Sequence, residues 1–516
     1  MDNEIYLAAD EFFPRCSPFG LTFDDISLAT RYSELVPKDV RIDTILSEEI
    51  SLTIPIISSD MDTVTESEMA IGMALNGGLG LIHYNMSKRQ QVKELTRVKH
   101  HVHGLIQDPI TITADKFVGD VLDLIEEKNF QFRTFPIVDD KGKLMGLLPG
   151  RVVKNRYKDK KVTEGMLERN EVYTISNSEV GKDPIATADK FFSDHIGIHK
   201  LLVVDEEDRL QGLYTLSDIE QIIGENSENL RPARDSNFRL RCGAAITVPR
   251  DLDGEIKSND LIAHVGEMLD KGLDIVAIST AHGHTKGVGD ATRMIRAAFP
   301  ELPIMAGNVT SAEGVEFLSE AGANSVKIGQ GPGSICTTRI VAGVGIPQMS
   351  ALYAAKRANI NKNISIIADG GISKSGDIVK ALTLSDAVIC GGLLAGCRES
   401  PGRIIEIEGK YYKQYRGMGS LEAMKHGSAA RYGHNQNELS EKSSPEGIEA
   451  LKEVSSSLKE TINGLAGGVR AGLGYLGAED LSVLRKQARF VRVTPAGQRE
   501  SAPHDVIQVK SNDFSH

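Results

Sequence analysis

Eight short apolar runs constrain the fold of this chain most strongly. Segments of helical length separate them, and each run breaks at Gly, Ser, Asn or Asp. Parallel strands are buried on both faces, so they read as continuous apolar runs. Eight such units predict an α/β fold, a (β/α)8 TIM barrel, with its active site at the carboxyl ends of the strands. The runs are IPIISSDMD (54–62), GLGLIHYN (78–85), LRCGAAITV (240–248), DIVAIST (274–280), LPIMAGNV (302–309), SVKIGQG (325–331), ISIIADGG (364–371) and DAVICGGLL (386–394).

An internal repeat interrupts the barrel pattern after its second unit. The segment FPIVDDKGKLMGLLPGRVVK (135–154) is echoed by LLVVDEEDRLQGLYTLSDIEQI (201–222), and TADKF begins at both 113 and 187. Two copies are too few for a solenoid, so we expect a pseudo-symmetric pair of strand-turn-strand-helix units. The expected domains are a first barrel part at 1–102, an insert at 103–226 and a second barrel part at 227–516.

The insert is similar to a tandem pair of CBS modules, the regulatory Bateman domain that senses adenine or guanine nucleotides. Its second copy has TLSD, from Thr215 to Asp218, which matches the Thr/Ser-x-x-Asp step that contacts ribose in such modules. The first copy has LPGR instead, so a purine nucleotide effector is expected at the second copy. An equally open alternative is that the pair only spaces or packs subunits.

Composition and charge exclude several classes of partner. The chain has 516 residues, 41% of them apolar, and a net charge of -12. That charge disfavours nucleic acid and acidic membrane surfaces. The five cysteines show no dense or C-x-x-C spacing, which indicates a reducing compartment without structural zinc. No apolar run reaches membrane length, and we expect a cytoplasmic protein.

The stretch GQGPGSICTTR (329–339) places one cysteine after a glycine-rich turn at a strand end. Cys336 by itself would more often be a structural core residue. Small polar neighbours at a barrel strand end favour a nucleophile instead, and no second ligand stands at zinc spacing. Ser334 and the glycine groups in ADGGI (368–372) and CGGLLAG (390–396) favour a phosphorylated small substrate.

These motifs resemble the inosine-5'-monophosphate dehydrogenase/GMP reductase family. GLTFDD, SSDMDTVTE, GNV, GPGSICTTR, GVGIPQ, IADGGI, GGLLAG, ESPG, YRGMGSLEAM and RY occur in the order found in that family. The insert also lies where the family carries its CBS modules. The resemblance covers nearly the whole chain.

The resemblance implies a specific chemistry for the cysteine. Cys336 would attack C2 of IMP, hydride would leave to NAD, and the remaining thioimidate would be hydrolysed to XMP. The residues implied as catalytic are Cys336, Thr338, Arg431 and Tyr432, the last two on a mobile flap at about 400–450. The residues implied to bind substrate are Ser59, Met61, Ser334, Asp369, Gly370, Gly371, Gly391, Gly392, Tyr415, Gly417, Met418, Gly419 and Glu446. Of these, Asp369 would accept the ribose hydroxyls.

Cofactor sites and assembly are likewise implied by the resemblance. The chain has no Rossmann glycine fingerprint, so NAD binding rests on the family alone. NAD would lie near Ser279, Thr280, Ala281, Asn308, Gly329 and Gly331. A potassium ion would bind carbonyls of Gly331, Gly333 and Cys336, completed by Glu500, Ser501 and Ala502 in a tail at about 498–508 of a neighbouring subunit. We therefore expect a homotetramer, or an octamer through the CBS modules.

Several positions depart from the family pattern. Ser279 stands where the family ordinarily has an aspartate that engages the nicotinamide riboside, and Gln330 replaces a usually apolar residue. Ala430 stands where an acid is common, and EALKEVSSSLKE (449–460) replaces a glycine-containing pattern. Losing the charge at position 279 predicts altered NAD binding.

Three functions therefore remain open from the sequence. The first is an NAD-dependent IMP dehydrogenase serving guanine nucleotide biosynthesis. The second is a CBS-containing GMP reductase that converts GMP to IMP with NADPH, which would not need Arg431 and Tyr432. The third is a catalytically weak nucleotide-sensing paralogue, which would not need Cys336, Thr338 and Arg431.

Overall fold

The structure is a computed structural model, and it describes residues 6–17, 19–101, 105–106, 109–128, 130, 132–176, 178–180, 183–226, 230–251, 254–358, 364–432, 444–503 and 505–506. The chain forms two compact units. One comprises Met1–Lys99, Leu230–Ala233 and Leu240–His516, and the other His100–Asn229 and Arg234–Arg239. The expected boundary residues 102, 103 and 227 lie outside the described residues.

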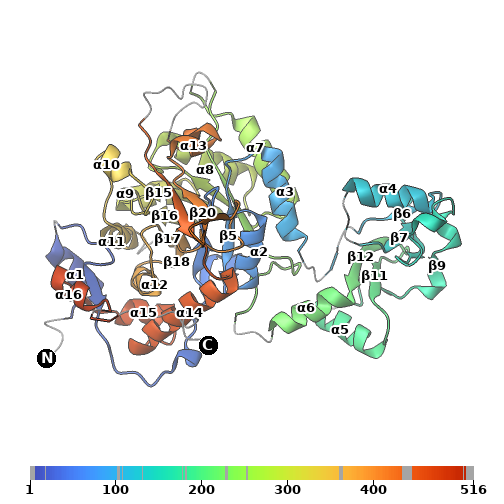
Figure 1. The fold of residues 1–516 in the computed structure, drawn as a ribbon, viewed down its shortest axis with the longest axis horizontal. Coiled ribbons are helices and arrows are strands. Elements are labelled where there is room, and N and C mark those ends of the chain that lie inside the picture. The colour runs from blue at the N-terminus through green and yellow to red at the C-terminus, as the bar shows by residue number, and fades with distance from the viewer. Residues whose placement is uncertain are drawn as a thin grey trace. The chain divides into compact units, whose positions relative to one another are not determined.

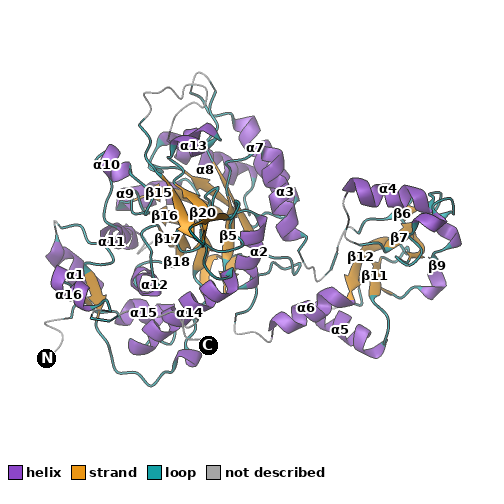
Figure 2. Cartoon of the chain, viewed as in Figure 1, coloured by secondary structure: helices purple, strands orange, loops and turns teal. Residues whose placement is uncertain are grey.

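Eight parallel strands close into a barrel in the larger unit, which confirms the predicted (β/α)8 fold (Figures 1 and 2). Their order around the barrel is β13-β14-β15-β16-β17-β18-β4-β5. Because β5 pairs with β13, the barrel closes across the point where the insert interrupts the sequence. Each predicted run contains one strand: β4 (Ile56–Ser58), β5 (Leu79–Ile82), β13 (Cys242–Ile246), β14 (Ile275–Ser279), β15 (Ile304–Val309), β16 (Ser325–Ile328), β17 (Ser365–Asp369) and β18 (Ala387–Cys390).

Two apolar layers explain why these strands read as continuous apolar runs. Ile57 and Ala245 belong to a core built mostly from strand residues, whereas Ile56 and Ala244 pack in a second core with the helices. Successive side chains on a strand point to opposite faces. The first core is therefore the barrel interior, and the second lies between the barrel and its helices.

Helices follow the strands and cover the outside of the barrel (Figure 2). Thr285 and Ser311 begin α8 and α9 by accepting a hydrogen bond from the N–H three residues on, which satisfies a free donor of the first turn. The covering helices are α2 (Ser67–Leu75), α3 (Lys88–Lys99), α7 (Ser258–Asp270), α8 (Lys286–Ala298), α9 (Ala312–Glu320), α11 (Gln348–Ala358), α12 (Ser375–Leu382) and α14 (Leu458–Tyr475).

Shorter elements complete the larger unit. The pair β2 (Thr44–Ser47) and β3 (Ile50–Leu52) forms a hairpin, and β1 (Ile26–Leu28) pairs with β22 (Phe490–Arg492). The remaining helices are α1 (Ala9–Cys16), α10 (Thr338–Val341), α13 (Leu421–Lys425), α15 (Leu481–Gln487) and α16 (Pro495–Glu500). No helix in the described part is both long and apolar enough to cross a membrane.

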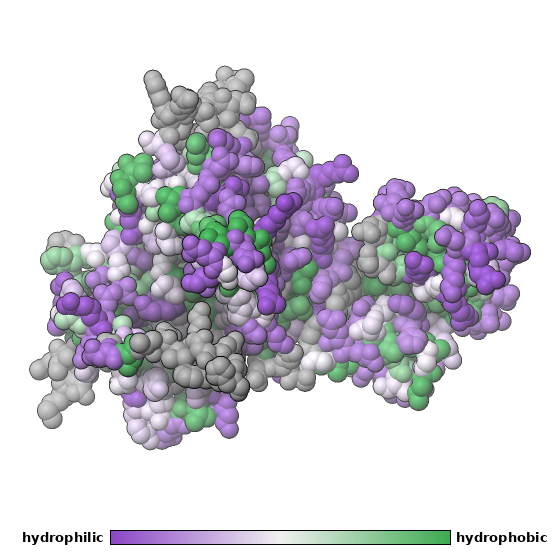
Figure 3. All heavy atoms as spheres, viewed as in Figure 1, coloured by the Kyte–Doolittle hydropathy of each residue, from purple (hydrophilic) through white to green (hydrophobic). Residues whose placement is uncertain are grey.

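A three-stranded antiparallel sheet follows the barrel: β19 (Ile405–Ile407), β20 (Lys410–Arg416) and β21 (Glu449–Glu453). Its exposed large apolar residues include Ile405, Ile407, Tyr411 and Leu451. Figure 3 shows an apolar patch over β20 on a face that is otherwise largely polar.

The smaller unit contains two sheets with separate apolar clusters. One sheet has the order β6-β7-β8-β9 and the other β10-β11-β12. The strands are β6 (Ile112–Thr113), β7 (Phe135–Val138), β8 (Leu144–Leu148), β9 (Leu167–Glu168), β10 (Thr174–Ser176), β11 (Lys200–Val204) and β12 (Leu210–Thr215), and the helices are α4 (Val118–Lys128), α5 (Pro184–Asp194) and α6 (Leu216–Asn226).

The predicted symmetry of the two repeats is wrong at two places. The second copy continues from β12 into α6, but the segment after β8 forms a 3-10 turn at Asn155–Tyr157 instead of an α-helix. Pro149 and Gly150 follow β8 directly, and both residue types disfavour a helix. The TADKF at 113 lies in a strand and turn, whereas the TADKF at 187 lies within α5.

Candidate active site

A cavity of about 330 Å³ lies at the carboxyl ends of the barrel strands. Most of the predicted site residues line it: Ser59, Met61, Thr280, Ala281, Asn308, Gly329, Gly331, Gly333, Ser334, Cys336, Thr338, Asp369, Gly370, Gly371, Gly391, Gly392, Tyr415, Gly417, Met418, Arg431, Tyr432 and Glu446. Among the described residues, the lining does not include Ser279, Gly419, Glu500, Ser501 or Ala502. The residues expected to form one site thus come together from six strands and the flap.

The Cys336 loop leaves β16 through Gly329, which no other residue could easily replace. Gly329 has φ 145°, and a Cβ there would lie 2.1 Å from the carbonyl oxygen of Asp369. The Cys336 N–H then donates to the Gly333 carbonyl at 3.1 Å, which closes a turn. The Cys336 Sγ lies 3.2 Å from the Thr338 hydroxyl, within hydrogen-bonding distance. The loop therefore presents a free, half-buried thiol to the cavity.

Two glycine pairs and a tyrosine form the expected phosphate end of the cavity. Gly370 and Gly371 have φ 95° and 78°, so the chain after β17 turns in the left-handed region. The Tyr415 hydroxyl lies 3.3 Å from the positions that Cβ atoms on Gly391 or Gly392 would take, so side chains there would narrow the cavity. Burial raises the pKa of Tyr415 to about 12. At neutral pH the tyrosine is thus a neutral donor, suited to an anion.

Asp369 and Asn308 form one wall of the cavity at the ends of β17 and β15. The Asn308 side-chain amide donates to an Asp369 carboxylate oxygen at 2.8 Å and to the Gly329 carbonyl at 2.9 Å. Its own amide oxygen is buried without a hydrogen-bond partner within the described part of the chain. The wall therefore offers a bound ligand a carboxylate and a free acceptor.

Arg431 and Tyr432 reach the cavity from a short 3-10 helix at Ser428–Tyr432. The Ala281 N–H donates to the Arg431 carbonyl at 3.1 Å, which ties this turn to the end of β14. Burial raises the pKa of Tyr432 above its usual value, although Arg431 acts in the opposite direction. Tyr432 is therefore un-ionised at neutral pH. Residues 433–443 of the expected flap lie outside the described residues.

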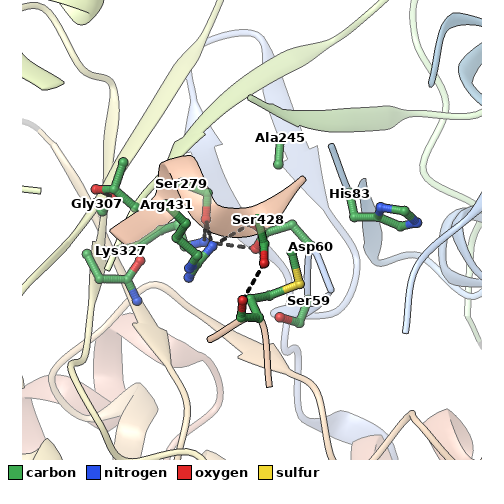
Figure 4. Close-up of polar contacts among 12 residues, drawn as sticks. Ser59, Asp60, His83, Ala245, Ser279, Gly307, Lys327, Ser428 and Arg431 are labelled. Carbon is green, nitrogen blue, oxygen red and sulfur yellow. Dashed lines mark hydrogen bonds and ion pairs between the residues drawn. The ribbon is translucent and has the colours of Figure 1, made fainter. Parts of the chain in front are cut away.

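Arg431 belongs to a buried charged cluster (Figure 4). The Lys327 Nζ donates to Asp60 Oδ1 at 2.9 Å and to Ser279 Oγ at 2.9 Å. Arg431 Nη1 donates to the same Ser279 oxygen at 2.6 Å and to Asp60 Oδ2 at 3.4 Å. The Ser279 hydroxyl thus accepts hydrogen bonds from both cationic side chains, and Ser279 does not line the cavity.

The charges in this cluster stabilise one another. Burial alone would raise the pKa of Asp60, but Lys327 and Arg431 hold it well below its usual value. Burial alone would lower the pKa of Arg431, but the groups around it, Tyr84 and Asp60 first, hold it above its usual value. Both groups are therefore charged at neutral pH.

Two other departures from the family pattern, Gln330 and the segment 449–460, have defined places in the structure. The Gln330 amide donates to the Ala281 carbonyl at 3.0 Å and lies 2.9 Å from His282 Nδ1. The segment 449–460 forms β21 and the start of α14. Among the described residues, no group of three His, Cys, Asp or Glu side chains is placed to hold a metal ion. Cys242 and Cys390 are buried in the core.

Comparison with known proteins gives the same family as the motifs. A model of the IMP dehydrogenase/GMP reductase domain matches residues 20–504. The chain belongs to this IMP dehydrogenase/GMP reductase family. Curated members named inosine-5'-monophosphate dehydrogenase are similar along nearly the whole chain. The protein of Halalkalibacterium halodurans is 44% identical and that of Aquifex aeolicus 42% identical, each over 94% of this chain and 96% of the relative. The protein of Bacillus subtilis is 43% identical over 96% of this chain and 97% of the relative.

A solved structure from the same family has a similar fold. A variant GMP reductase from Trypanosoma brucei in complex with guanosine 5'-monophosphate superposes with a TM-score of 0.82 and 32% identity. The alignment covers 96% of this chain and all of that one. Members of the family named for two different reactions therefore resemble this chain along its whole length.

Proposed function

We propose that this chain is an IMP dehydrogenase, which oxidises IMP to XMP and supplies guanine nucleotide biosynthesis. The observation that carries the proposal is the placement of Cys336 beside Thr338, in one cavity with Asp369, the glycine pairs, Arg431 and Tyr432. The full-length similarity to proteins named inosine-5'-monophosphate dehydrogenase supports the same reaction.

The proposed chemistry uses the thiol twice. The Cys336 sulfur, as thiolate, forms a bond to C2 of the purine, and the hydride then leaves C2. NAD, when bound, accepts that hydride. Water next adds to C2 of the resulting thioimidate, the C2–S bond breaks, and the thiolate returns as XMP and a proton are released. Arg431, Tyr432 and Thr338 would position this water and assist its proton transfer.

The residues of this chain fit both substrates. Ser334, Tyr415 and the amides around Gly371 and Gly392 would hold the 5'-phosphate, and Asp369 would accept the ribose hydroxyls. NAD would contact Thr280, Ala281, Gly329, Gly331 and Asn308. The unpartnered buried oxygen of Asn308 suits an amide or hydroxyl donor. Because Ser279 is held by Lys327 and Arg431, we do not assign it a direct contact with the nicotinamide riboside.

A potassium ion and an oligomer form a further part of the proposal. Carbonyl oxygens of Gly331, Gly333 and Cys336 are ligands of the kind hard cations prefer. Glu500, Ser501 and Ala502 of a neighbouring copy would complete the site. The apolar patch over β20 and the exposed Ile340 after the cysteine loop supply surfaces for contact between subunits of a tetramer. In the insert, Asp218 is the expected contact for a purine nucleotide effector.

The alternative is a GMP reductase, the activity named for the Trypanosoma brucei structure that superposes on this chain. Both activities are read at 340 nm. We expect NADH to form from IMP and NAD, faster with potassium, and to be absent in Cys336→Ala. Oxidation of NADPH with GMP, and none with IMP, would assign the reductase instead. Inactivity with both substrate pairs would favour the nucleotide-sensing paralogue.

A further inference from the structure

Two cationic side chains, Lys327 and Arg431, are buried close to each other next to the cavity. The Lys327 side chain is fully buried, and only 13% of the Arg431 side chain is exposed. Burying a charge is costly unless a counter-charge and hydrogen bonds compensate it. This arrangement therefore requires a carboxylate that both cations can reach.

Asp60 is that carboxylate. Its side chain is 2% exposed, one oxygen lies 2.9 Å from Lys327 Nζ and the other 3.4 Å from Arg431 Nη1. Asp369 also lies 3.4 Å from Lys327, but it accepts from Asn308 and lines the cavity, where the ribose would need it. Ser279 contacts both cations but contributes only a neutral hydroxyl.

We propose that Asp60 is a positioning residue that fixes the guanidinium of Arg431 for the hydrolytic half of the reaction. This inference rests on the proposed IMP dehydrogenase activity. Asp60 and Ser279 both accept from one terminal nitrogen of Arg431, so they hold that nitrogen in place while Arg431 still lines the cavity.

The carboxylate of Asp60 follows a different barrel strand from the one that carries the aspartate in the family pattern. The family ordinarily places an aspartate at the end of β14, where this chain has Ser279. Here the carboxylate follows β4, between Ser59 and Met61, and still reaches the same Lys327. Asp60 also leaves Asp369 available to the ribose, because Lys327 has a nearer carboxylate.

The test measures hydride transfer and hydrolysis separately. In stopped-flow experiments with IMP and NAD, we expect Asp60→Asn to keep a first-turnover burst near one NADH per active site, since the thiol and the substrate contacts remain. The steady rate after the burst should fall at least about tenfold, because a charge-assisted contact to Arg431 is lost. In an Arg431→Gln background, adding Asp60→Asn should change the steady rate less than twofold, since the two residues act as one unit.

Relocating the carboxylate provides the rescue. Asp60→Asn/Ser279→Asp moves the charge to a side chain whose present hydroxyl contacts Lys327 at 2.9 Å and Arg431 at 2.6 Å. We expect this variant to recover most of the steady rate. It also preserves the buried charge, so it tests the proposal even if Asp60→Asn alone does not fold.

Asp274→Asn is the matched control, because Asp274 forms a similarly buried pair with Lys99 at 2.6 Å, just before β14 begins. It should lower the melting temperature without slowing the steady rate relative to the burst. A wild-type rate in Asp60→Asn, or a folded relocation variant that stays slow, would overturn the role of Asp60. A wild-type chain that forms no NADH from IMP would refute the proposed function itself, and the role of Asp60 with it.

Discussion

The two threonines after Cys336 have different surroundings. Thr338 Oγ1 lies 3.2 Å from Cys336 Sγ, whereas Thr337 Oγ1 donates to the Pro445 carbonyl at 3.4 Å. We expect Thr338→Val to lower the steady rate of NADH formation about 10- to 100-fold, the range of a lost hydrogen bond to an ionised group. Thr337→Val is the control and should retain the wild-type rate. Equal losses in both variants would contradict a specific role for the Thr338 hydroxyl.

The depressed pKa of Asp60 predicts a pH-dependent stability. A carboxyl whose pKa is lower in the folded state stabilises the protein above its unfolded pKa, near 3.8, and that stabilisation is lost as the pH falls toward the folded value. Asp60→Asn should therefore lower the melting temperature at pH 7 and pH 5 by similar amounts, through about 3–5 kcal/mol of lost pairing. The difference from wild type should shrink at pH 3. A difference that grows on acidification would contradict this assignment.

One partner of the buried Lys327–Asp60 pair could be anticipated from the sequence, and the other could not. Lys327 interrupts the apolar strand run SVKI, and a lysine in a buried strand requires a buried acid nearby. That signal is visible in the sequence. Its partner is not, because Asp60 is 267 positions away and meets Lys327 only through barrel closure.

The glycines of the loop after β16 differ in what they tolerate. A Cβ at Gly329 would lie 2.1 Å from the Asp369 backbone oxygen, whereas a Cβ at Gly343, also with positive φ, meets nothing within 4 Å. Gly329→Ala should therefore displace the loop and reduce NADH formation at least about 100-fold, since small displacements of catalytic groups cost that much. Gly343→Ala should cost only about 1 kcal/mol of backbone strain and remain active. Similar activity in the two variants would show that the close contact is not retained.

The accuracy of the sequence prediction differed between kinds of element. All eight barrel strands followed from apolar runs, because strands buried on both faces leave a strong local signal. The repeat predicted a helix after β8, but Pro149 and Gly150 follow that strand and prevent the helix. The prediction was wrong because it relied on the similarity between the two copies and gave too little weight to these two helix-breaking residues. The 3-10 turn that carries Arg431 depends on contacts such as Ser428 with Met418, which no local pattern indicates.

The molecule as a whole is organised so that the barrel does not depend on the insert for closure. β5 and β13 pair directly, from Gly80 with Cys242 to Ile82 with Ala244, although the insert separates them in sequence. The apolar clusters of the barrel draw on none of the described residues between 100 and 229, and the insert has clusters of its own. Each unit therefore has the core that independent folding requires.

This separation predicts how a chain without the insert should behave. Replacing residues 101–229 with a short Gly-Ser linker should leave the β5–β13 pairing and the cavity intact, because a short loop replaces a long one at small entropic cost. The steady rate of NADH formation should stay within about twofold of wild type, as expected for changes that share no contacts with the site. Any response of that rate to added purine nucleotides should disappear.

Asp218→Asn in the full-length chain is the matched comparison for that deletion. It leaves the insert in place and changes one side chain, whose pKa burial raises and which lies at the expected ribose step. If the insert senses nucleotides, both variants should lose the response while keeping the basal rate. If the insert only spaces subunits, Asp218→Asn should behave as wild type. The deletion should then change the size of the assembly measured by light scattering. Added nucleotides should not affect the rate of wild type or of either variant. A nucleotide titration of wild type, the deletion variant and Asp218→Asn therefore distinguishes the two functions of the insert that the sequence left open, nucleotide sensing and subunit spacing.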